Sequence, residues 1–226
     1  MVKGRYSLLV LPLLVITSCG NKQRELRSDI KEFISGFSLT KSIENYKAAS
    51  YSSTFESYVN GVKENEDEYV EFDCRDDANI TYSHVLNTYR DDVHVSTKRE
   101  TIATEEGKYI HTLDDNSEEY TKAQCISLIT TYFYRSEPVE GFHDYGMYDG
   151  DYIIGVALTF QDYITIDQEN KTLEFNILID DPQSDAKIKH EAKVNETGML
   201  LRVYNKTEKL STKEYAVREI TTSKIS

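Results

Sequence analysis

Apolar and polar side chains alternate along most of this chain, and the alternation restricts its fold more than any other feature. After Lys47 the pattern recurs in short runs, such as the one in which Val70, Phe72 and Cys74 alternate with acidic residues. Successive side chains of a β-strand point to opposite faces of a sheet, so each run predicts a strand with one buried and one solvated face. Sheets with a solvated face are typically antiparallel.

Turn signals divide these runs into two sets of strands. Asn60-Gly61, Asp91-Asp92 and Glu106-Gly107 are sequences that favour tight turns. The first set predicts an antiparallel meander over residues 51–59, 70–74, 79–89, 93–104 and 108–113. The second set predicts strands at 152–160, 173–179, 186–194, 199–206 and 213–221, with a turn at 167–171 that pairs the first two.

The first segment with helical spacing precedes the strands. Apolar residues recur at i, i+3, i+4 and i+7 from Ile30 to Phe37, and the helical spacing continues to Tyr46. Residues 28–46 therefore predict one kinked helix or two short helices.

A second helix is expected at 122–135, between the two sets of strands. Thr121 and Gln124 fit a capping box at its start, and an apolar face follows them. These elements predict an α+β fold in which a mostly antiparallel sheet packs on an N-terminal helix and a mid-chain helix. Residues 28–226 contain no repeat, low-complexity block or linker, so we expect a single domain there.

The N-terminus carries a hydrophobic run unlike the rest of the sequence. Lys3 and Arg5 precede nine residues without a polar side chain, Leu8 to Ile16. Nine residues are too few to span a bilayer, which needs roughly 20, and the arrangement is typical of a secretory signal.

Ile16-Thr17-Ser18-Cys19 resembles the lipobox of bacterial lipoproteins. The resemblance implies that residues 1–18 are a signal peptide and that Cys19 is lipidated, with residues 19–27 as a tether. Two or more acyl chains on one cysteine give stable anchoring, so we expect the protein on the extracytoplasmic face of the cell membrane. An ordinary secretory signal with a cysteine near its end is the alternative.

The charge of the chain excludes one class of partner. Lys and Arg total 26 against 39 Asp and Glu, a formal net charge of −13, and removal of residues 1–18 makes the protein more acidic. Such a surface repels phosphate backbones, so we expect no nucleic-acid binding.

The order of helix, long meander, amphipathic helix and second meander resembles the LolA-like family of lipoprotein carriers and the related LppX and LprG lipoproteins. The segments that carry the likeness are the opening helix, residues 107–120 and residues 195–209. The resemblance implies a strongly curved antiparallel sheet, a half-barrel, wrapped around helices with an apolar cavity between them. A sheet packed on a helix with a solid core is the alternative.

Aromatic and aliphatic residues on the second helix, in the loop 136–151 and on the strand 152–160 are the candidates for lining such a cavity. They are Leu128, Tyr132, Phe142, Tyr145, Tyr148, Tyr152, Ile154, Val156 and Leu158.

Motifs for catalysis and for cofactors are absent from the sequence. It has no G-x-S-x-G elbow and no glycine-rich phosphate loop, and none of its five histidines belongs to a zinc motif. We therefore expect no catalytic residues, no cofactor and no metal. Cys74 and Cys125 either form a disulfide or are two buried thiols.

Two functions are compatible with these features. In the first, the protein binds a lipid, an acyl chain or another apolar ligand between sheet and helix. In the second, it is a non-catalytic envelope or surface lipoprotein with a filled core that contacts or senses another protein.

Lipidation of Cys19 leads to a direct prediction. Metabolic labelling with a clickable fatty acid should mark the wild-type chain and leave the Cys19→Ala variant unmarked. Equal labelling of the two chains would contradict the lipobox interpretation.

Overall fold

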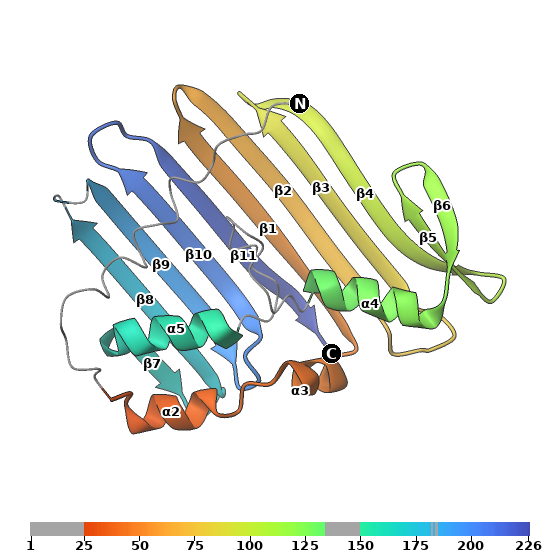
Figure 1. Ribbon diagram of the computed structural model, residues 1–226, viewed down its shortest axis with the longest axis horizontal. Helices are drawn as coiled ribbons and strands as arrows, with labels where there is room; N and C mark the ends of the chain where they lie inside the picture. The colour runs from red at the N-terminus through yellow and green to blue at the C-terminus, as the bar shows by residue number, and fades with distance from the viewer. Residues whose placement is uncertain (1–24, 134–149, 182, 184) are drawn as a thin grey trace.

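A computed structural model describes residues 25–133, 150–181, 183 and 185–226. Within these residues, eleven strands form one open antiparallel sheet in the order β6-β5-β4-β3-β2-β1-β11-β10-β9-β8-β7 (Figure 1). The strands are β1 (Ala48–Val59), β2 (Val62–Asp73), β3 (Thr81–Arg90), β4 (Val93–Glu105), β5 (Lys108–Leu113), β6 (Asn116–Tyr120), β7 (Ile164–Asp167), β8 (Thr172–Asp181), β9 (Ala186–Asn195), β10 (Leu200–Lys209) and β11 (Tyr215–Ile225). The helices are α2 (Ser28–Ile34), α3 (Leu39–Asn45), α4 (Lys122–Phe133), α5 (Gly150–Phe160) and the short 3-10 helix η2 (Gln161–Tyr163).

The predicted turns join the long hairpins of the first meander. Asn60 and Gly61 both have positive φ, 54° and 78°, as do Glu106 and Gly107, 51° and 80°. Two successive residues with positive φ match the right-handed twist of paired strands, which is why Asn-Gly and similar pairs favour such turns. These two turns set the register of β1 with β2 and of β4 with β5.

The two meanders meet in the middle of the sheet. β11 pairs antiparallel with β1, so that Ser53 lies opposite Ile220 and Phe55 opposite Arg218. This pairing places β6 and β7 at opposite edges of the sheet, and the chain between them crosses from one edge to the other. α4 and α5 belong to that crossover (Figure 1).

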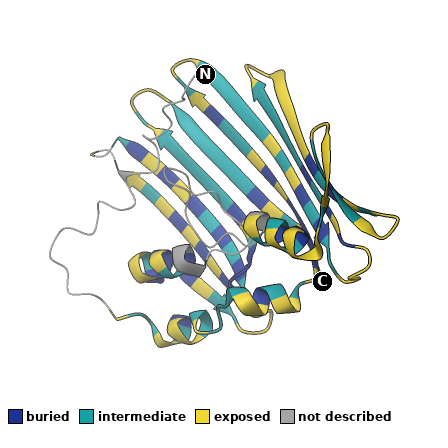
Figure 2. Cartoon of the chain, turned by 45° about the vertical axis from the view of Figure 1, so that its right-hand side comes forward, coloured by how far each residue is buried: buried dark blue, intermediate teal, exposed yellow. Residues whose placement is uncertain are grey.

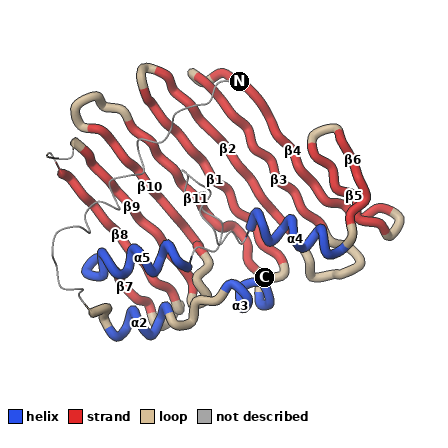
Figure 3. The backbone as a smooth tube through the Cα atoms, in the orientation of Figure 1, coloured by secondary structure: helices blue, strands red, loops and turns tan. Residues whose placement is uncertain are grey.

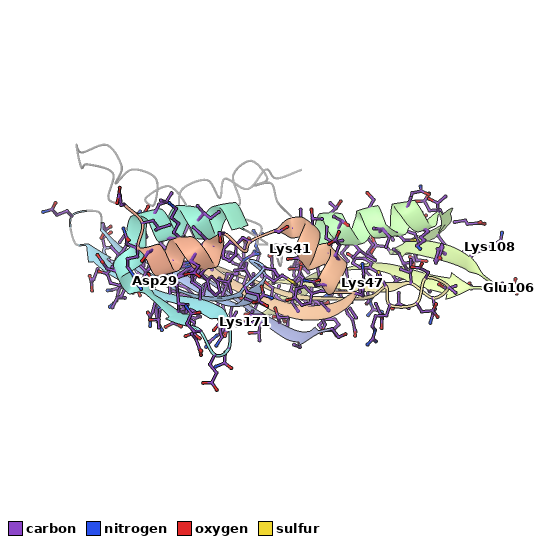
Figure 4. The ribbon with its side chains drawn as sticks, turned by 90° about the horizontal axis from the view of Figure 1, so that it is seen from below. Asp29, Lys41, Lys47, Glu106, Lys108 and Lys171 are labelled. Carbon is purple, nitrogen blue, oxygen red and sulfur yellow. The ribbon has the colours of Figure 1, made fainter. Side chains whose placement is uncertain are left out.

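The described helices lie on one side of the sheet, across one end of the strands (Figures 3 and 4). Strand residues facing the helices are buried and their neighbours are exposed, most regularly in β9 (Figure 2). The helices contribute apolar side chains that are at most 3% exposed to the same core, namely Ile30, Cys125, Ile129, Ile153 and Ala157. The sheet therefore has the one buried and one solvated face that the alternation predicts.

The first two helical predictions are confirmed. Residues 28–46 form two short helices, and a Ser38 hydroxyl that accepts from the Lys41 amide starts the second one. At α4, the Thr121 amide donates to Gln124 Oε1 over 2.9 Å and the Gln124 amide donates to Thr121 Oγ1 over 3.3 Å. This reciprocal pair is the predicted capping box.

The strand predicted at 152–160 is wrong, because this segment lies in the helix α5. The segment is apolar at nearly every position, so it fits the helical spacing of Ile153, Val156 and Ala157 as well as it fits alternation. Periodicity alone does not separate the two for a short apolar run, and contact with the sheet decided the outcome. The turn predicted at 167–171 is present, but it joins β7 to β8. The sequence analysis missed both edge strands, β6 and β7.

The packing of α4 leads to a stability prediction. Ile129 is 3% exposed, so Ile129→Ala should lower the free energy of unfolding by about 2–5 kcal/mol in a denaturant titration. Leu128 is half-buried and Leu128→Ala should cost less. Exposed Ser127 supplies the control, since Ser127→Ala should change stability by less than about 0.5 kcal/mol. Equal losses for all three variants would mean that the orientation of α4 is different.

Candidate functional site

The residues predicted to line an apolar cavity do not all lie on one surface. Leu128 and Ile154 are half-buried, Val156 is buried, and Leu158 is 53% exposed. Phe142, Tyr145 and Tyr148 and the side chains of Tyr132 and Tyr152 lie outside the described residues.

Leu158 faces away from the core because its segment is helical. Residues two apart on a strand share a face, whereas residues two apart on a helix are separated by about 200°. Ile153, Val156 and Ala157 form the face of α5 that turns toward the sheet. The sequence analysis missed Ile153 and Ala157, although their i, i+3, i+4 spacing with Val156 was a usable signal.

Both described cysteines are free thiols in the core region. Cys125 is buried on α4, and Cys74, just after β2, packs against the same apolar cluster. Burial, together with the charge of Asp73, raises the pKa of Cys74 to about 11, and burial also raises the pKa of Cys125. The thiolate is the nucleophilic form, so neither cysteine is activated for chemistry, and their pairing stays a prediction.

A row of acids and histidines, buried at its centre, crosses five neighbouring strands on the helix side of the sheet. We call it the histidine–glutamate row, and its members are Glu68 on β2, His84 on β3, Glu100 on β4, His111 on β5 and Glu118 on β6. Strand register creates it, because His84 lies opposite Glu100 and His111 lies opposite Glu118.

Short contacts link the members of the row. His84 Nε2 donates to Glu68 Oε1 over 3.0 Å, and His84 Nδ1 lies 3.9 Å from Glu100 Oε2. His111 Nε2 donates to Glu100 Oε1 over 3.0 Å, and its Nδ1 lies 3.5 Å from Glu118 Oε1. The Tyr120 ring stacks on His111 at 4.3 Å between ring centroids. The central three members are each about 5% exposed, so the centre of the row is shielded from water, whereas the Glu118 side chain at its end is 66% exposed.

Electrostatics keep the centre of the row charged. Burial on its own lowers the pKa of His84, but the carboxylates of Glu100 and Glu68 outweigh burial and raise it to about 9. Burial also opposes ionisation of Glu100, yet contacts with His84 and His111 hold its pKa below the usual value. At neutral pH the row therefore contains an imidazolium between two carboxylates.

His190 shows what burial does without close carboxylates. It lies on β9, 3% exposed, with its ring 5.0 Å from that of Phe175. Burial lowers its pKa to about 4, and the nearby charge of Glu191 raises it only in part. His190 is thus a neutral core residue.

The histidine–glutamate row links strands β2 to β6 through pairs of opposite charge. In the part of the chain that the structure describes, no group of three or more His, Cys, Asp or Glu residues is arranged to hold a metal ion. Replacing one member of a buried charge pair leaves the other without compensation, which typically costs about 3–5 kcal/mol. The sequence analysis considered these histidines only for zinc and missed the row.

A second polar cluster fixes the point where the N-terminal segment joins the fold. The Arg27 amide donates to Gln161 Oε1 over 2.8 Å, and the Arg27 guanidinium donates to the carbonyls of Gln161 and Ile164. Gln161 Nε2 in turn donates to the carbonyl of Glu25 over 3.2 Å. Gln161 is 2% exposed, so this clamp holds the chain before α2 against η2 from inside the fold.

Comparison with known proteins does not add a family to these observations. No protein-family model and no curated protein matches the chain.

The raised pKa of His84 predicts a pH-dependent stability. A pKa of about 9 in the folded state, against 6.5 when unfolded, stabilises the fold fully below pH 6.5, and this contribution is lost as pH rises through about 9. The stability difference between wild type and His84→Gln should therefore shrink by about 3 kcal/mol from pH 6 to pH 10 in urea titrations.

The control for this prediction is His94→Gln, which removes an exposed histidine from the same sheet. It should leave the pH dependence of the wild type unchanged. A His84→Gln variant whose stability follows the wild-type pH profile would show that His84 is not charged in the folded protein.

Proposed function

We propose that this chain is an extracytoplasmic lipoprotein, anchored to the cell membrane through Cys19, that binds a lipid or acyl chain between its sheet and its helices. The signal-like run Leu8 to Ile16 and the following Ser18-Cys19 support the anchor. Among the described residues, no helix is both long enough and apolar enough to cross a membrane.

The crossover between β6 and β7 is the observation that carries the ligand-binding proposal. Its two described helices, α4 and α5, both lie on one face of an open sheet and pack apolar residues against it (Figure 1). The helices of this crossover contact the sheet through side chains and form no strand hydrogen bonds, so they can separate from it without breaking strand pairing. An apolar molecule between them would replace the protein contacts of Leu128, Ile154 and Val156.

The element order adds support from the resemblance to LolA-like carriers. Two short helices, six strands, two helices and five strands follow one another in the described chain. In a carrier of this kind the sheet would curve around α4 and α5 as a half-barrel, and the cavity would open between them. The proposed protein carries out no chemistry and needs no cofactor.

A filled-core interaction protein is the second candidate. It is favoured by the continuity of the core, in which buried residues of both meanders belong to one apolar cluster. In that case the protein would contact or sense another envelope protein, and the interior would hold no ligand.

Native mass spectrometry of residues 22–226 distinguishes the lipid carrier from the filled-core interaction protein. We expect an additional mass that organic extraction removes, because a bound lipid would remain in an apolar interior. Val156→Phe enlarges a buried residue between α5 and the sheet and should reduce this mass, whereas Leu158→Phe makes the same kind of change on the exposed side and should not. A wild-type protein without additional mass would contradict the carrier function and favour the interaction protein.

A further inference from the structure

The N-terminal segment joins the fold at one corner of the molecule. α2, the end of α5, η2 and the edge strand β7 lie together there, and Asp29 marks the corner in Figure 4. The clamp of Arg27 and Gln161 fixes the chain at this corner as far back as the Glu25 carbonyl. Any anchor upstream of Glu25 therefore pulls on η2 and the end of α5.

The length of the tether limits how far this corner can lie from a lipid anchor. Six residue steps separate Cys19 from Glu25, and a fully extended chain of that length reaches roughly 20 Å. This extended length is the upper limit of the distance between the two residues. If Cys19 is lipidated, as the proposed function states, this corner is held close to the bilayer.

The same corner exposes large hydrophobic side chains. Leu158 is 53% exposed and Tyr163 is 52% exposed, and each lies within three residues of Gln161 in the sequence. The ring of Phe160, which is half-buried, lies 6.4 Å from that of Tyr163. One turn before Leu158, a Cβ added to Gly155 would meet nothing within 4 Å, so the outer side of the helix is open.

We infer that the outer surface of α5 and η2, centred on Leu158 and Tyr163, rests on the bilayer that holds the lipid anchor. An aliphatic side chain beside a tyrosine suits the boundary between headgroups and acyl chains, where tyrosine is enriched. This inference rests on the proposed lipidation of Cys19. It extends the proposed function, because a lipid that reaches the space between α5 and the sheet would then arrive from the adjoining membrane.

The charges at this corner identify the kind of lipid surface. Asp29 is paired with Arg27, and Glu25 and Asp162 are exposed acids at the same corner. Exposed acids disfavour an anionic surface. The contact therefore depends on apolar insertion into neutral headgroups, for which phosphatidylcholine vesicles are a suitable probe.

Tryptophan reporters can test this inference, because the chain has no tryptophan of its own. The full-length lipidated protein carrying Leu158→Trp is reconstituted into phosphatidylcholine vesicles that contain brominated acyl chains, which quench tryptophan nearby. Val93→Trp is the matched control, since Val93 is 67% exposed and begins β4, near the opposite edge of the sheet from β7.

The inference predicts that quenching of the Leu158→Trp reporter exceeds that of the Val93→Trp reporter by about twofold or more, since interfacial side chains insert about 5–10 Å. Equal quenching of the two reporters in protein that floats with the vesicles would overturn the inference and leave the anchor intact. Flotation of Cys19→Ala to the same extent as wild type would overturn the anchor itself. Both failures are therefore distinguishable.

Discussion

The pairing of β1 with β11 is the contact on which the rest of the structure depends. It joins residues near the start of the domain to residues at its end and merges two local meanders into one sheet. Each meander alone would leave a long edge of unpaired backbone groups, which favours aggregation. With β1 and β11 paired, neither of these long strands is an edge, and the sheet ends in the short strands β6 and β7, of which β6 carries the charged residues Glu118 and Glu119.

The position of the helices follows from that same pairing. Because β6 and β7 lie at opposite edges, the connection between them spans the width of the sheet, and the apolar residues of its helices α4 and α5 pack on one face. The other face stays solvated and carries cross-strand ion pairs such as Lys193 with Glu174 and Lys187 with Asp180. Exposed pairs of this kind add little stability, so the free energy of the fold comes mainly from the helix side.

The helix side is not uniformly apolar, and its two buried histidines on β3 and β9 illustrate the reason. His84 and His190 are about equally buried, yet the pKa of one rises and that of the other falls. The difference lies in Glu68 and Glu100, which the register brings to His84. A charged row tolerates no shift of register between β2 and β6, because a shift of one residue would place its members on the solvated face.

The sequence by itself determined the elements whose signals are local. Alternation located most of the strands, the Asn60-Gly61 and Glu106-Gly107 turns located hairpins, and Thr121 with Gln124 located the start of α4. Each of these signals lies within a few residues of chain, so its physical cause is present in the sequence. The anchor at Cys19 and the bound ligand are proposals that also begin from local patterns.

Only the tertiary structure decided the features that depend on distant segments. An almost continuous apolar run at 152–160 has no preference of its own between helix and strand, and its position in the crossover made it α5. Glu68, His84 and Glu100 are sixteen residues apart in turn, and they meet only because three strands pair in one register. The exposure of Leu158 beside the Arg27–Gln161 clamp also depends on distant segments. Whether a side chain is buried or exposed is decided by which other parts of the chain pack over it.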